Sequence, residues 1–165
     1  MARGSYFVTG SNITVANAAQ TILSLRPNTT ASIEFLRLWI SQAANATSAQ
    51  QRVDYTSKAA VLGSGYTSGT VNKAVQIDAT STLSGGTTEA AGAVGIGNAT
   101  VTEGAGTETI IGSDSFNVLN GWLWVPTPAE TIIFGAAAAT PFQMRFAAAP
   151  GTLTGWNWGC TFREQ

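Results

Sequence analysis

Trp156-Asn-Trp-Gly-Cys-Thr-Phe-Arg163 alternates apolar residues with small or polar ones. Successive side chains of a β-strand point to opposite faces, so this period of two predicts a strand with one buried face. The residues that we expect in the core are Trp156, Trp158, Cys160 and Phe162. Residues 142–146 repeat the pattern, with Gln143 and Arg145 between Phe142, Met144 and Phe146.

A third strand is predicted over residues 31–41, and it has apolar residues on both faces. One face carries Leu36, Leu38 and Ile40, which we assign to the core. The other carries Ile33, Phe35 and Trp39. Such a strand is either central in the fold or meets another subunit through its second face. We predict that Ile33, Phe35 and Trp39 are interface residues for self-association.

Short strand patterns separated by turn residues continue along most of the chain, and neither Ala-rich stretch is assigned to a helix. Asn120-Gly121, between Phe116–Leu119 and Trp122–Val125, predicts a two-residue hairpin. Many short strands with frequent turns favour an all-β, antiparallel jelly-roll or β-sandwich. We predict a single domain over residues 1–165, beginning with an N-terminal arm or first strand at residues 1–10.

Residues 81–106 form a long stretch rich in Gly, Thr and Ala, with few large side chains. We interpret it as a surface excursion with edge strands near residues 93–97 and 99–103, because long segments of this kind are usually functional or disordered. Glu103, Glu108 and Asp114 lie in or near its glycines and are interpreted as solvated.

Composition excludes several kinds of chemistry. Ala, Thr, Gly and Ser supply 80 of the 165 residues, only 17 residues are charged, and there is no histidine. Ser-His-Asp catalysis and His-bound metals are therefore excluded, and Cys160, as the only cysteine, excludes an internal disulfide and a thiolate zinc site. We predict that the protein is not an enzyme, that it has no catalytic, cofactor-binding or metal-binding residues, and that it needs no cofactor.

Neither nucleic acid nor a membrane is an expected partner. Eight basic residues against nine acidic ones do not supply the clustered positive charge that phosphate binding needs. No apolar run approaches the roughly 20 residues of a membrane helix. Low charge combined with a Thr/Ser/Ala surface instead suits a protein that is largely covered by neighbours.

The five tryptophans raise one alternative, a carbohydrate-binding module, because exposed indole rings stack on sugars and jelly-rolls often serve as lectins. Most of the tryptophans lie in strand patterns that predict core or interface positions. Trp39 is the best candidate for an exposed platform, since Leu36, Leu38 and Ile40 already supply a core face.

The C-terminal third carries a resemblance to a known family. Its sequence reads Ser115-Phe-Asn-Val-Leu-Asn-Gly-Trp-Leu-Trp-Val-Pro-Thr-Pro128, followed by Ala147-Ala-Ala-Pro150 and a last strand that ends Phe162-Arg-Glu164. This arrangement resembles a family of small tailed-bacteriophage virion proteins. The N-terminal stretches TILSLRPNTT and ASIEFLRLWIS are also similar to that family.

The resemblance implies a jelly-roll decoration, or cement, protein on the outside of a phage head, assembled in the bacterial cytoplasm. Its partners would be the major capsid protein and further copies of itself, often as a trimer. In this reading Trp122 and Trp124 anchor a strand, and Pro126 and Pro128 end it.

For the capsid contact we predict the arm at residues 1–6, including Arg3 and Tyr6, together with residues 81–106. The alternative functions are a carbohydrate- or host-receptor-binding jelly-roll and a structural protein of the phage tail or neck.

Overall fold

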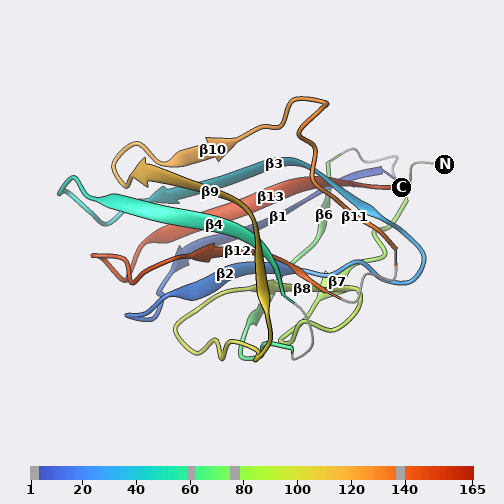
Figure 1. The fold of residues 1–165 in the computed structure, drawn as a ribbon, viewed down its shortest axis with the longest axis horizontal. Coiled ribbons are helices and arrows are strands. Elements are labelled where there is room, and N and C mark those ends of the chain that lie inside the picture. Colours follow the sequence, from blue (N-terminus) through green and yellow to red (C-terminus); the bar gives the residue numbers. More distant parts are fainter. Residues whose placement is uncertain (1–3, 59–61, 75–78, 137–139) are drawn as a thin grey trace.

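The computed structural model describes residues 4–58, 62–74, 79–136 and 140–165 (Figure 1). These ranges contain strands and turns, and no helix that could cross a membrane. The strands are β1 (Gly4–Ile13), β2 (Gln20–Leu25), β3 (Ile33–Gln42), β4 (Gln50–Lys58), β5 (Thr67–Ser68), β6 (Asn72–Lys73), β7 (Ser84–Gly85), β8 (Ala93–Ile96), β9 (Glu108–Asn117), β10 (Trp122–Trp124), β11 (Ile133–Phe134), β12 (Phe142–Phe146) and β13 (Trp156–Glu164). The prediction of an all-β fold is confirmed.

Two sheets pack against each other as a β-sandwich. Sheet A has the order β10-β3-β13-β1-β6, with β11 also on β3, and sheet B has the order β5-β8-β2-β12-β4-β9, with β7 on β8. The eight principal strands of the two sheets form two antiparallel sets, β10-β3-β13-β1 in sheet A and β2-β12-β4-β9 in sheet B. Followed along these eight strands, the chain changes sheets after β1, β2, β3, β9, β10 and β12, and this arrangement is a jelly-roll.

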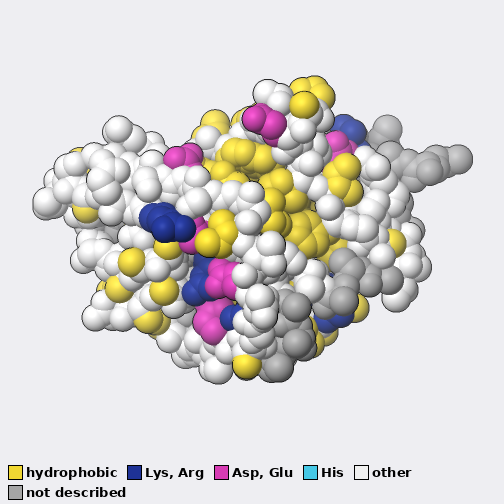
Figure 2. All heavy atoms as spheres, in the orientation of Figure 1, with side chains coloured by type: hydrophobic (Ala, Val, Ile, Leu, Met, Phe, Trp, Pro, Cys, Tyr) yellow, Lys and Arg dark blue, Asp and Glu magenta, His cyan; other side chains and the backbone are white. Residues whose placement is uncertain are grey.

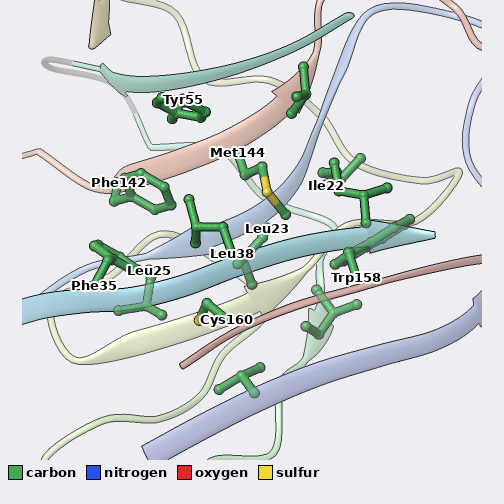
Figure 3. Close-up of a cluster of buried hydrophobic side chains, with 14 of the residues drawn as sticks. Ile22, Leu23, Leu25, Phe35, Leu38, Tyr55, Phe142, Met144, Trp158 and Cys160 are labelled. Carbon is green, nitrogen blue, oxygen red and sulfur yellow. The ribbon is translucent and has the colours of Figure 1, made fainter. Parts of the chain in front are cut away.

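The core lies between the two sheets and is built from their alternating inward side chains (Figure 3). Its largest members are fully buried, among them the predicted Trp156, Trp158 and Phe162, and the predicted Cys160 is fully buried as well. The ring of Phe146 on β12 lies 4.7 Å from that of Trp156 on β13, so aromatic contacts join the two sheets. The predicted burial of alternate residues over 156–163 is confirmed.

A β-bulge in β3 overturns part of the predicted interface. Phe35 pairs with Phe162 and Arg37 pairs with Thr161, which leaves Leu36 as an extra residue. One extra residue reverses the alternation of a strand. Ile33 and Phe35 therefore face the core together with Leu38 and Ile40, and all four are buried. The prediction that Ile33 and Phe35 form a subunit interface is wrong, and Trp39 alone of the three faces outward, half-buried.

The first strand overturns a second interface residue. Tyr6 is fully buried in β1, with its ring 5.6 Å from that of Phe162, and its Oη donates a hydrogen bond to the carbonyl of Ala79. Tyr6 faces inward because β1 pairs with β13 from its first residue, so its prediction as a capsid contact is wrong. Arg3, the other predicted contact in this arm, lies outside the described residues.

The segment between β4 and β9 is built into the sandwich. It adds β6 to the edge of sheet A at β1, and it adds β5, β7 and β8 to the edge of sheet B at β2. All four residues of β8 are buried, so residues 81–106 are not a surface excursion as predicted, although the strand near 93–97 is confirmed. Residues 99–103 contain a single bridge, from Thr102 to Ser64, in place of the second strand.

The turn at Asn120-Gly121 does not close a hairpin. It connects β9 in sheet B with β10 in sheet A, so the strands on either side of it do not pair. Gly121 has a φ of 70°, a left-handed conformation that favours glycine. The predicted turn is present, but it carries the chain across the sandwich.

Candidate functional site

A layer of buried polar groups fastens the β4–β9 segment to the outer face of sheet B. At its centre is Glu89, whose side chain is almost fully buried. The Glu89 carboxylate accepts hydrogen bonds from the backbone N–H of Gly63 at 2.7 Å, from Tyr66 Oη at 2.8 Å and from Gln143 Nε2. Burial, together with the adjacent Glu89 charge, raises the pKa of Tyr66 well above its usual value. These groups form a satisfied structural network.

Two further carboxylates fasten the same segment. Glu103 accepts hydrogen bonds from the backbone N–H and the hydroxyl of Thr21 on β2, and its Oε2 lies 3.8 Å from Lys58 Nζ. Glu164, fully buried at the end of β13, accepts hydrogen bonds from the N–H of Thr82 at 3.0 Å and from the Ser81 hydroxyl. The interpretation of Glu103 as solvated is wrong, because it satisfies polar groups of β2.

Ion pairs continue this polar surface toward β9. Arg52 Nε donates hydrogen bonds to Asp54 Oδ1 at 2.8 Å and to Ser113 Oγ at 2.9 Å, and Arg145 pairs with Glu108. The pairs border a hollow of about 380 Å³. Figure 2 shows basic and acidic side chains intermixed on this face. Because each charge has an opposite partner, the interpretation of Glu108 as merely solvated is also wrong.

The outer face of sheet A is different in character. Trp39 on β3 lies between Leu123 on β10 and Gly159 on β13 in one row across the sheet. A Cβ atom at Gly159 would come within 2.8 Å of the Trp39 ring, so the indole packs directly over this glycine. The ring borders a hollow of about 340 Å³ that is also lined by Arg37, Ser41, Asn120, Gly121 and Leu123.

Exposed apolar side chains are concentrated along one side of the sandwich. Among the described residues, eight large hydrophobic side chains are exposed, and six of them form what we call the apolar edge: Ile110, Ile111, Leu119, Leu123, Val125 and Ile133. Figure 2 shows apolar side chains gathered over the area bounded by β9, β10 and β11. The chain has no lysine or arginine between Lys73 and Arg145, the stretch that contains all six residues of the apolar edge.

The predicted structural motif lies beside the apolar edge. Trp122 and Trp124 form β10 and face inward, each with its ring 5.8 Å from that of Tyr55 on β4. Trp122 Nε1 donates a 2.8 Å hydrogen bond to Asp114 Oδ2 on β9, so Asp114 also has a structural partner. The strand ends at Trp124, shortly before Pro126 and Pro128.

Sequence reasoning missed the apolar edge, although its residues were visible. Ile110 and Ile111 are adjacent, so alternation assigns only one of them to the surface. The bulge that leaves Ile111 without a partner in β4 exposes both side chains. Leu123 and Val125 alternate with two tryptophans, a pattern that is compatible with a buried central strand as well as with an exposed apolar face.

Other reactive groups give little indication of chemistry. Burial raises the pKa of the Cys160 thiol to about 12, which keeps it protonated at neutral pH. In the part of the chain that the structure describes, no group of three or more His, Cys, Asp or Glu residues is placed to hold a metal ion. Comparison with family models, curated proteins and solved structures finds no match to this chain.

Proposed function

We propose that this protein is a structural virion protein that decorates the outside of a tailed-phage head and bridges major capsid subunits. The observation that carries the proposal is the apolar edge, which supplies exposed apolar side chains for a contact and meets the charged hollow of sheet B at Ile110. The jelly-roll is a fold that viral capsid proteins use. The resemblance of residues 115–164 to phage virion proteins supports the same assignment.

The geometry favours attachment through side chains rather than through strand pairing. β9 is the last strand of sheet B, and a long free edge can recruit a strand from another chain. The bulge at Ile111 and the exposed charge of Asp114 are both features that protect such an edge. We therefore expect the partner to cover Leu123, Val125 and Ile133, which are between 57% and 61% exposed.

Attachment of this kind suits a closed lattice. Each contact buries a limited apolar area, but many copies held around one shell, or an oligomer that spans several sites, bind far more tightly than one copy. Apolar contacts also depend less on ionic strength than ion pairs do. The low charge of the chain is therefore compatible with stable decoration.

Electron cryomicroscopy of purified virions tests the location. We expect density for the jelly-roll on the head exterior between capsid subunits. Density confined to the tail or neck would replace the proposal with the alternative role there, and absence of the protein from purified virions would reject both assignments.

A binding experiment tests the surface. Heads that lack the protein are mixed with the purified wild type or with the double variant Leu123→Asp, Val125→Asp, and occupancy is measured after sedimentation. We expect at least a tenfold loss of occupancy, because charged side chains would have to be desolvated in the contact. Leu62→Asp is the matched control, since Leu62 is 41% exposed but lies outside the apolar edge, and it should leave occupancy unchanged.

A further inference from the structure

We propose that the outer face of sheet A binds a carboxylate-bearing saccharide, with Trp39 as the stacking platform and Arg37 as the anion-binding group. The proposal rests on the hollow of about 340 Å³ at this face. Because Leu123 belongs both to this hollow and to the apolar edge, the site is tested on the free protein. Jelly-rolls also serve as lectins, so the fold is compatible with such a site.

The first step is the placement of Trp39. The bulge at Leu36 turns Trp39 outward while its neighbours Leu38 and Ile40 enter the core. Gly159 opposite it has no side chain, so the indole packs over the backbone of β13 and borders the hollow. A rigid aromatic ring at the wall of a shallow hollow is suited to the apolar C–H face of a pyranose.

The second step is the charge beside the ring. Arg37 is two residues from Trp39 on the same outward face of β3, and it is exposed. The other arginines in the described ranges have an acidic or carbonyl partner: Arg26 with the Glu89 carbonyl, Arg52 with Asp54, Arg145 with Glu108 and Arg163 with Glu34. Within those ranges the structure shows no hydrogen bond or ion pair for Arg37. Its guanidinium is therefore available to a ligand carboxylate, which it can bind through two parallel hydrogen bonds.

The third step is the remaining wall. Ser41 and Asn120 offer hydroxyl and amide groups that can bind sugar hydroxyls, and Leu123 adds an apolar border. The lining of the hollow contains no acidic residue, so nothing in it repels an anion. A combination of one aromatic ring, one cation and a few uncharged polar groups fits an acidic sugar better than a neutral sugar or an apolar peptide.

Nuclear magnetic resonance titration of the whole protein tests the proposal. Methyl glucuronide is compared with methyl glucoside, which lacks only the carboxylate, and the indole signal of Trp39 is assigned from the Trp39→Phe variant. We expect a saturable shift of that signal with glucuronide, with a dissociation constant on the order of 1 mM, and at least tenfold weaker binding of glucoside.

Variants then separate the two groups, with binding followed through the backbone amide signals of Gly121 and Leu123, which line the hollow. Trp39→Ala should weaken glucuronide binding at least tenfold, and Arg37→Gln should remove the preference for glucuronide over glucoside. Arg52→Gln is the matched control, because Arg52 is an exposed arginine on sheet B, and it should bind normally. Retention of the other indole signals shows that each variant is folded.

Three results would overturn the site. The first is an unshifted Trp39 signal at about 50 mM glucuronide, well above the expected dissociation constant. The second is unchanged binding by Trp39→Ala. The third is a Trp39 signal that moves with protein concentration in the absence of sugar, which would assign this face to self-association. Normal head attachment by Trp39→Ala leaves the proposed function intact in any of these cases.

Discussion

The two outer faces of the sandwich differ in how far the described part of the chain covers them. On sheet B, the segment between β4 and β9 packs across the outer face, and buried groups such as Glu89 and Gln143 hold it there. On sheet A, the described part of the chain leaves Trp39 and Arg37 at the surface beside a shallow hollow. Three acidic residues, Glu89, Glu103 and Glu164, fasten the segment between β4 and β9. The described part of the chain does not cover the hollow on the opposite face.

The difference shows where binding is to be sought. Burying a carboxylate is unfavourable unless hydrogen bonds satisfy it, so the three donors around Glu89 indicate a structural role. Trp39 instead packs over Gly159 with part of its ring left at the surface, where it borders the hollow. Substitutions on the two faces should therefore differ sharply in their effect on stability.

The largest expected difference lies within β3. Phe35→Ala should lower the free energy of unfolding by roughly 3–5 kcal/mol, because it opens a cavity beside Phe142, whose ring centroid lies 4.1 Å away. Trp39→Ala should cost about 1 kcal/mol, since the indole is only half-buried. Urea unfolding of both variants measures the difference, and equal losses would contradict the bulge at Leu36.

The next effect concerns the covered face of sheet B. Glu89→Ala leaves the N–H of Gly63, the hydroxyl of Tyr66 and the amide of Gln143 without their acceptor, which should cost roughly 3 kcal/mol. We expect faster hydrogen exchange in residues 62–107 while the tryptophan core stays protected. Glu130→Ala is the control, because Glu130 is exposed, and its effect should stay within about 0.5 kcal/mol. If protection were lost equally in the segment between β4 and β9 and in the tryptophan core, Glu89 would not stabilise that segment independently of the core.

A smaller effect is expected at Gly97, which follows β8 and lies against the backbone of β2. A Cβ atom at Gly97 would lie 2.4 Å from the carbonyl oxygen of Thr21, so Gly97→Ala forces the backbones apart and should cost roughly 1–3 kcal/mol. Gly151→Ala, where a Cβ atom meets nothing within 4 Å, is the control. Thermal unfolding of the pair gives the comparison, and a stable Gly97→Ala protein would mean that this contact is loose.

The sequence predicted the sandwich because several core strands, β12 and β13 above all, carry their own alternation. Trp156 to Phe162 needs no other segment to show which face is buried. The bulge at Leu36 could not be predicted in the same way. It is defined by the pairing of β3 with β13, and the sequence of one strand does not specify which residues it pairs with in another.

The structural roles of Gly97 and Glu103 could not be predicted for a related reason. Gly97 and Glu103 meet β2 only after the chain has crossed from β4 over the edge of the sandwich. Local composition therefore resembled a flexible loop. The candidate site was partly predictable. Trp39 was identified as a tryptophan that the core did not need, but Arg37, which lines the same hollow, was not identified.

The smallest effect is expected on the open face of sheet A, at the ion pair between Arg163 and Glu34. The Arg163 Nη1 and Glu34 Oε2 atoms are 3.4 Å apart, and the arginine side chain is 44% exposed, so water screens the pair. Arg163→Gln should lower stability by about 0.5 kcal/mol, and the loss should vanish in about 1 M salt. Arg145→Gln breaks a more buried pair on sheet B, where the arginine is 14% exposed, and its loss should be larger and persist in salt. Equal salt sensitivity of the two variants would mean that both faces are equally open to solvent.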